Sequence, residues 1–210
     1  MTGDVIMPRS KIKPDVKAKK IDPTFILAFD EFVDQFKNES DRAAVILATA
    51  KIDYSLFQLI SCFLIPNTTK KDELLDPDEN GALSSLSARI SLCYRLGIID
   101  AEFARALHLV RKIRNEFAHE VKDAKLDLPP HRDRIRELTK IVSDTELFAD
   151  VKERYFSDKS GLIADFFTTL TILTLRLETL FQKIKPLKAN FAYPIVPSNY
   201  SGKNQNKQKL

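Results

Sequence analysis

The sequence predicts an all-α protein, an antiparallel bundle of helices with a flexible arm at each end. Along several long segments, apolar residues recur at the three-to-four residue spacing of a helix that is packed on one side. Glycine is scarce, with 5 in 210 residues. This scarcity disfavours glycine-rich phosphate loops and multi-turn β architectures. A hydrophobic fraction of 44%, with 14 Phe and no Trp, is ample for one core built from Phe and Leu.

Charge divides the chain into three regions, 1–22, 23–185 and 186–210. The first and last carry net charges of +3 and +4 and lack helical periodicity, so we expect flexible basic arms. The arm 1–22 is either a contact for nucleic acid or a partner, or only a solubilising tail. Because the formal net charge of the whole chain is +4, the region 23–185 carries a net charge of −3. A single helical domain is expected there, without a basic groove for duplex DNA.

Two helices are expected before the first long connection. Pro23 occupies a tolerated first-turn position, and Phe recurs at helical spacing as far as residue 37. A second segment, 41–64, is apolar on nearly all sides, as expected of a central helix, and Pro66 ends it. Asp53 within this segment needs a partner, because a lone buried carboxylate is costly. We expect Arg89 to be that partner; the alternative is a catalytic carboxylate.

A polar connection, 67–85, contains a sequence that imitates a calcium loop. Residues 76–81 read D-P-D-E-N-G, similar to the start of an EF-hand. The twelfth loop position is Ser87, where a bidentate Glu is required, so we interpret the segment as a turn and a helix start. The histidines are also too scattered for a zinc site. We therefore predict no metal and no cofactor. The chain has three histidines: His108, His119 and His131.

The third predicted helix, 86–96, is followed closely by a fourth. Gly97 ends the third helix as a C′ glycine does, and Asp100 caps the fourth, which continues to His119. The short link implies antiparallel packing. This pair could imitate a helix-turn-helix motif. Its second helix, however, uses its apolar face for the core in the ordinary way.

The C-terminal half is predicted to contain two more helices. After a break at 126–130 we expect a short helix over 131–142, an irregular segment over 151–160 and a long final helix over 162–184. The final helix is apolar over enough of its surface to serve both the core and a dimer contact. The short helix carries a basic cluster, which is either a solvated face or an RNA contact. Its members are Arg132, Arg134 and Arg136.

The two cysteines and the apolar runs indicate a cytoplasmic protein. Cys62 and Cys93 both lie in apolar helical sequence, so we expect them to be buried and reduced. Residues 1–20 lack the apolar centre of a signal peptide. No run of about 20 uninterrupted apolar residues is present, and no membrane contact is expected.

The segment 109–120 has two unlike faces when it is drawn as a helix, at about 100° per residue. The first face is apolar and requires a core: Leu109, Val110, Ile113 and Phe117. The opposite face gathers polar groups around one small residue, which leaves room for a ligand to approach. It consists of Arg111, Arg114, Asn115, Ala118 and His119, with His108 nearby.

This polar face suits attack by a ribose 2′-hydroxyl on the neighbouring phosphate without a metal. His119 would act as base or acid, and Arg114 would stabilise the developing negative charge. Asn115 would orient the imidazole or hold a phosphate oxygen, and Arg111 and His108 would contact RNA. Alternatively, the arginines are solvated helix charges, and the His119 imidazole only complements the dipole of the helix C-terminus.

Two family resemblances follow from these residues. The run Arg-Asn-Glu-Phe-Ala-His at 114–119 resembles the Arg-Asn-x-x-x-His signature of the HEPN superfamily. Many of its members are metal-independent ribonucleases, often toxins or defence effectors, that act as dimers with facing motifs. The longer pattern over 74–99, from Leu-Leu-Asp to Tyr-Arg-Leu-Gly-Ile-Ile, resembles the mannitol-operon repressor (MltR) family. That resemblance extends over roughly 42–185 and implies a HEPN-like helical bundle of regulator type.

Two functions follow from the resemblances. The first is a metal-independent RNA endonuclease, in which Arg114, Asn115 and His119 act across the cleft of a homodimer and a regulatory or antitoxin protein restrains the activity. The second is a non-enzymatic transcriptional repressor or co-repressor that acts through protein contacts. The complete motif favours the first function, and the family and the acidic core favour the second. We prefer the ribonuclease hypothesis, which requires the Arg114/His119 face to be accessible.

Overall fold

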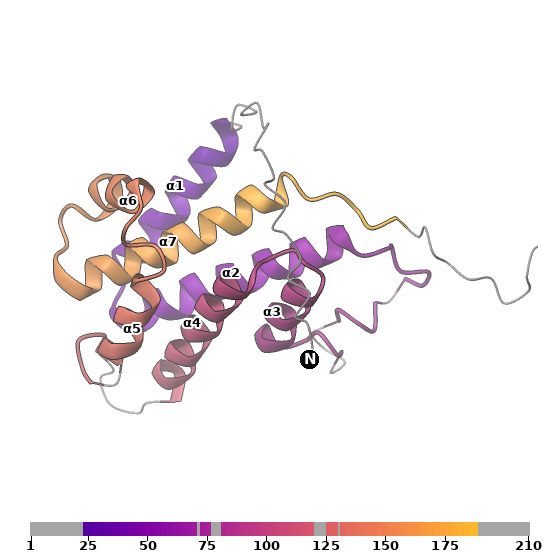
Figure 1. Cartoon of the computed structure of the whole chain (residues 1–210), viewed down its shortest axis with the longest axis horizontal. Coiled ribbons are helices and arrows are strands. Elements are labelled where there is room, and N and C mark those ends of the chain that lie inside the picture. The colour runs from indigo at the N-terminus through magenta and orange to yellow at the C-terminus, as the bar shows by residue number, and fades with distance from the viewer. Residues whose placement is uncertain (1–22, 71, 77–80, 120–124, 130, 189–210) are drawn as a thin grey trace, which may run out of the picture.

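The structure is a computed structural model with seven helices and no strand among the residues it describes, which confirms the all-α prediction (Figure 1). It describes residues 23–70, 72–76, 81–119, 125–129 and 131–188. The predicted flexible arms lie almost wholly outside these residues. The helices are α1 (Pro23–Lys37), α2 (Asp41–Phe63), α3 (Leu86–Arg95), α4 (Ala101–His119), α5 (His131–Thr139), α6 (Glu146–Phe156) and α7 (Gly161–Phe181).

Helices α2 and α7 form the centre of the bundle, and the other helices pack around them (Figure 1). α3 and α4 cover one part of α2, α5 and α6 cover α7, and α1 contacts α2, α6 and α7. The core is strongly aromatic. The Phe36 ring lies 6.2 Å from that of Phe156 and, edge-on, 5.7 Å from that of Phe167. These rings from α1, α6 and α7 join the helices in one apolar core.

Helix α2 is long and apolar enough to cross a membrane when only its length and composition are considered, and so is the bent pair of α6 and α7. In the bundle, half of the apolar window of α2 is buried, and the helix packs against α1, α3, α4 and α7. This is the packing of a central core helix, as the sequence predicts.

Helix α7 contains threonines that lower its intrinsic helix propensity. The hydroxyls of Thr168, Thr171 and Thr174 each donate to the carbonyl four residues earlier, at 2.7 to 2.9 Å. These buried hydroxyls are therefore satisfied within the helix. Burial of the surrounding Leu, Ile and Phe side chains stabilises α7 despite the low propensity.

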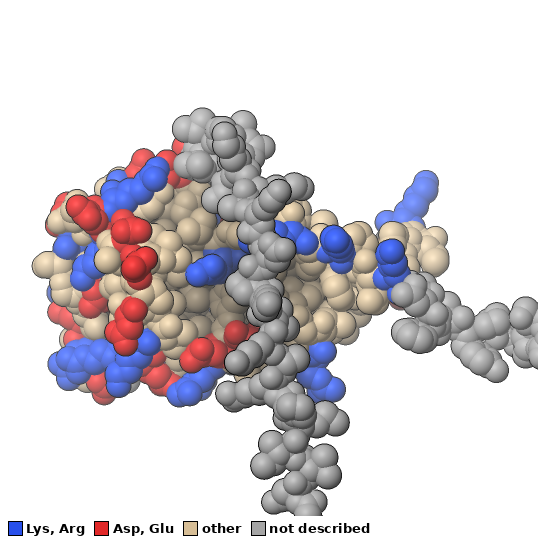
Figure 2. All heavy atoms as spheres, turned by 45° about the horizontal axis from the view of Figure 1, so that its top comes forward, with Lys and Arg blue, Asp and Glu red and all other residues tan. Residues whose placement is uncertain are grey.

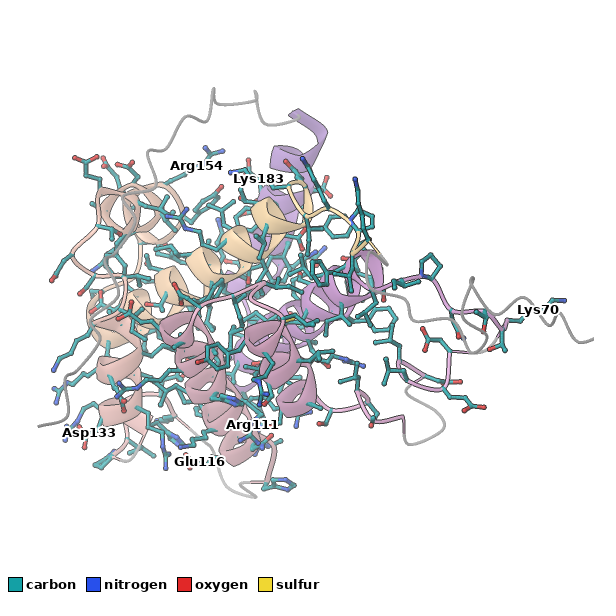
Figure 3. All side chains as sticks on the ribbon, turned by 45° about the vertical axis from the view of Figure 1, so that its right-hand side comes forward. Lys70, Arg111, Glu116, Asp133, Arg154 and Lys183 are labelled. Carbon is teal, nitrogen blue, oxygen red and sulfur yellow. The ribbon has the colours of Figure 1, made fainter. Side chains whose placement is uncertain are left out.

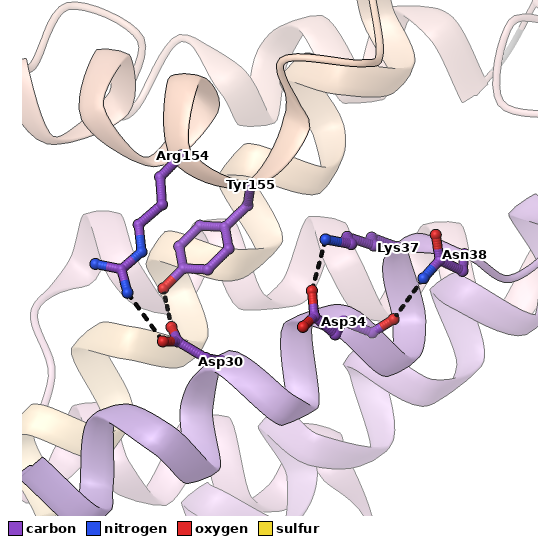
Figure 4. Close-up of polar contacts among 6 residues, drawn as sticks. All are labelled: Asp30, Asp34, Lys37, Asn38, Arg154 and Tyr155. Atoms are coloured by element: carbon purple, nitrogen blue, oxygen red, sulfur yellow. Dashed lines mark hydrogen bonds and ion pairs between the residues drawn. The ribbon is translucent and has the colours of Figure 1, made fainter.

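Helix α1 is joined to α6 by a polar contact at the edge of the core (Figure 4). Asp30 accepts hydrogen bonds from the Tyr155 hydroxyl and, at 2.9 Å, from the Arg154 guanidinium. Burial, followed by the hydrogen bond to Asp30, raises the pKa of Tyr155 to about 12. The phenol therefore remains a donor at neutral pH.

Local signals located most helix ends correctly. Ser40 and Ser85 cap α2 and α3, and the Asp100 carboxylate accepts the Phe103 N–H at 2.8 Å at the start of α4. Gly97 has a φ of 71°, as a C′ glycine requires. The predicted helix over 131–142 is shorter, because α5 ends at Thr139.

Two predictions are wrong. The segment 151–160 is not irregular, because α6 occupies Glu146–Phe156; Thr145 caps it, and Phe148 and Phe156 anchor it in the core. Cys62 is exposed rather than buried, whereas Cys93 is buried as expected. The last turn of α2 directs Leu59 and Ile60 into the core and leaves Cys62 on the outer side.

The different environments of the two thiols predict stepwise labelling by a disulfide reagent. Burial raises the pKa of Cys93 to about 12. The reagent therefore cannot reach this thiol, and the thiol stays protonated and unreactive. At about pH 8, close to the unperturbed thiol pKa, the folded protein should react at Cys62 alone, and Cys93 should react only after unfolding. Cys62→Ser should abolish the fast phase. Equal fast reaction of both thiols in folded protein would contradict this arrangement.

Candidate functional site

Helix α4 holds the candidate residues on one side and is fixed in the bundle by the other. Ile113 and Phe117 are fully buried, as the apolar face requires. On the opposite side Arg111 is half-buried, and Arg114 and His119 are exposed. The polar face is therefore at the surface of the single chain.

Glu116, within the motif, attaches α4 to α5 (Figure 3). Its carboxylate lies 3.1 Å from Nδ1 of the buried His131 and accepts a hydrogen bond from Arg134. The His131 ring also lies 4.6 Å from the ring of Phe117. His131 is therefore part of the helix junction and lies apart from the polar face of α4.

The basic cluster of α5 is largely engaged. Arg134 pairs with Glu116, and the Arg136 guanidinium lies 3.7 Å from the Asp133 carboxylate. These pairs favour the interpretation of this cluster as a structural and solvated face, rather than as an RNA contact.

A hollow of about 380 Å³ lies between α2, the start of α3 and α4. Three of the predicted site residues line it: Arg111, Arg114 and Asn115. His108 and His119 are not among its lining residues. Three polar residues that the sequence analysis did not connect with the site also line it: Thr49, Ser85 and Ser87. Ser85 was recognisable as part of a helix start, but its closeness to α4 depends on how the helices pack.

Arg114 and Asn115 contact each other directly. The Arg114 guanidinium donates to the Asn115 side-chain oxygen at 3.1 Å. This bond orients the amide and leaves its NH₂ group as a donor. His119 is the last residue of α4.

His108 lies near the polar face, but its surroundings disfavour a positive charge on its imidazole. Burial, followed by the charges of Arg111 and Lys112, lowers the pKa of His108 below its ordinary value of 6.5. The imidazole is thus neutral at neutral pH.

Asp53 at the wall of the hollow is paired as the sequence predicted. Its carboxylate accepts a hydrogen bond from the Arg89 guanidinium at 2.7 Å. Arg89 is only 6% exposed, and its guanidinium lies 5.3 Å from the centre of the Phe57 ring. This pair joins α2 to α3 and neutralises Asp53, the only acid among the described residues that line the hollow.

In the part of the chain that the structure describes, no group of three or more His, Cys, Asp or Glu side chains is placed to hold a metal ion.

Comparison with known proteins identifies a shared fold. No protein-family model matches the sequence, and no curated protein matches it. Among solved structures, the chain is similar to MtlR of Escherichia coli, determined as the MtlR–HPr complex. The two share 20% identity with a TM-score of 0.52, and the match covers 71% of this chain and 98% of that one.

A structure from Shigella flexneri 2a, described as a possible transcriptional regulator YggD, is similar to the same extent. It has 16% identity and a TM-score of 0.52, with 74% of this chain and 97% of that chain covered. The protein therefore has the all-helical fold of these two proteins. The likeness to MtlR agrees with the fold that the sequence resemblance implied, and the resemblance of residues 114–119 to the HEPN signature stays a prediction.

The Asp53–Arg89 pair predicts a measurable coupling. Asp53→Asn leaves the buried guanidinium without its counter-charge and should lower the free energy of unfolding by about 1–3 kcal/mol. The double variant Asp53→Asn/Arg89→Met removes that charge and should recover part of the loss. Urea unfolding of the variants measures both effects. Strictly additive losses in the double variant would show that the pair contributes no coupling.

Proposed function

We propose that this protein is a regulator that acts by binding another protein of HPr type. The observation that carries this proposal is the likeness to E. coli MtlR, which extends over 98% of that chain and was solved as a complex with HPr. Charge supports protein rather than DNA as the partner. In the face shown in Figure 2, acidic and basic side chains of the described residues are intermixed at one end of the bundle. Duplex DNA requires an extended basic surface.

Helix α2 offers an apolar contact surface that this function requires. Leu47 and Tyr54 are 43% and 55% exposed on the outer side of the helix, and neither lines the hollow between α2, α3 and α4. The Tyr54 ring stacks on Phe57, with centres 6.5 Å apart and planes 22° apart. A rigid aromatic side chain beside aliphatic ones is typical of the residues that contribute most to binding. We assign this outer surface of α2 to the partner.

Binding of purified HPr, measured by titration calorimetry, tests the proposal. Tyr54→Ser should weaken binding about tenfold or more, as loss of a central aromatic contact does. The matched control is Tyr94→Ser, because Tyr94 is a similarly exposed tyrosine, at 47%, on α3. It should leave the affinity nearly unchanged. Absence of HPr binding to the folded wild-type protein would overturn the proposal.

A metal-independent ribonuclease is the second candidate function, and one observation favours it. Arg114 and His119 are both exposed on α4, so the face is not packed inside the chain. In this candidate function, Arg114 stabilises the phosphate, His119 moves the proton, and Asn115 donates its free amide N–H. The facing motif of a second copy would complete the site, so this function also requires the homodimer that the sequence analysis predicted.

RNA cleavage in the presence of EDTA tests the ribonuclease candidate. Wild-type protein should leave 2′,3′-cyclic phosphate ends, and both His119→Ala and Arg114→Ala should lower the rate by about 10²-fold or more. Lys112→Ala is the control, because Lys112 is also an exposed residue of the same helix. Light scattering should verify that all variants have the same mass, twice the 24.0 kDa of one chain. Cleavage that persists in both motif variants would indicate a contaminating nuclease.

A further inference from the structure

We propose that the hollow between α2, α3 and α4 is a binding site for a phosphate monoester of a small polar molecule. Its volume, about 380 Å³, lies in the range of small-ligand sites. Its lining combines an apolar wall with several convergent polar groups, which is the usual composition of such sites. The apolar wall consists of Ile46, Ala50 and Leu86.

The hollow has a surplus of two positive charges. Arg111 and Arg114 line it, and neither forms an ion pair with another described residue. Asp53, the one acid that lines the hollow in the described part of the chain, is already paired with Arg89 at 2.7 Å. The neighbouring acid on α4, Glu116, is engaged by α5. An anionic ligand would therefore meet two guanidinium groups without competition from a carboxylate.

Arg111 contains a donor that a ligand would satisfy. Its Nε atom is withdrawn from solvent and has no hydrogen-bond partner among the described residues. A buried donor without a partner is unfavourable. The side chain as a whole is only half-buried, so the guanidinium can turn toward a bound oxygen. The planar fork of a guanidinium matches two phosphate oxygens.

Other donors surround the same space. Ser87 lines the hollow in the first turn of α3, where backbone N–H groups have no intrahelical acceptor and an anion is favoured. The Ser85 hydroxyl oxygen accepts the Ala88 N–H at 3.2 Å and thereby caps α3. Asn115 retains its NH₂ group, since its oxygen accepts from Arg114. The Ser87 hydroxyl, the Asn115 amide and the two guanidinium groups therefore converge on one volume.

The charge count favours a terminal phosphate over the phosphodiester of RNA. A phosphate monoester carries about −1.5 to −2 charge at pH 7 and balances the two unpaired guanidinium groups. A diester carries a single charge and would leave one guanidinium uncompensated. His119, which RNA cleavage requires, also lies outside the lining. This site does not depend on the partner protein proposed above.

Calorimetric titration of the full chain with glycerol 3-phosphate tests the site in the absence of partner protein and RNA. Wild-type protein should bind it saturably, and dimethyl phosphate, a small diester, should bind at least about tenfold more weakly. Arg111→Gln and Ser87→Ala should each weaken the binding of glycerol 3-phosphate. Arg95→Gln is the control, because Arg95 is an exposed arginine on α3 that does not line the hollow. It should bind like the wild type.

Circular dichroism verifies that each variant is folded. If Arg111→Gln does not fold, Arg114→Gln replaces it, because Arg114 is exposed. The proposal is overturned if wild-type protein shows no saturable binding, if the diester binds equally well, or if the lining variants bind like the control. None of these outcomes would change the result for HPr binding, so the phosphate site and the HPr contact are tested separately.

Discussion

The burial of α2 against α7 is the contact on which the rest of the bundle depends. Most of the buried residues of both helices are apolar, and Glu178 makes polar contacts from α7 to α2. The Glu178 carboxylate of α7 accepts the Ser55 hydroxyl at 2.7 Å and lies 2.8 Å from the Lys51 ammonium group. Apolar burial supplies most of the stabilisation, but it is not directional. The Glu178 link favours this register, because sliding either helix would separate the partly buried carboxylate from its Ser55 and Lys51 donors.

Helix α2 contributes both to the core and to the candidate site. One side of α2 belongs to the core, and the edge near Asp53 forms a wall of the hollow. The Asp53–Arg89 pair holds the start of α3 against that wall, and the contacts of Glu116 with α5 hold the last turns of α4. Two ion pairs far apart in the sequence thus position the guanidinium groups of α4 relative to the N-terminus of α3. The surplus of positive charge in the hollow is a result of these pairings.

The polar face of α4 would serve phosphate binding and RNA cleavage through overlapping sets of residues. Arg111, Arg114 and Asn115 open into the hollow, whereas His119 lies at the exposed end of the helix. A role in phosphate binding needs the first three residues and the serines of α3. A role in RNA cleavage would need Arg114, Asn115, His119 and a second copy of the chain. Protein binding through the outer surface of α2 would need neither set. Substitution of Tyr54, Ser87 or His119 would therefore each impair one proposed function.

Sequence alone determined the local elements other than α6, because helix periodicity, caps and stop signals depend on neighbouring residues. It located the two faces of α4, the cap at Asp100 and the C′ position at Gly97, and it identified Arg89 as the partner of Asp53 from the cost of burying a carboxylate. The exposure of Cys62 depended on tertiary structure, because the packing direction of an almost uniformly apolar helix cannot be read from its own residues. The meeting of Ser87 with Arg111 was likewise decided by the packing of α3 against α2 and α4.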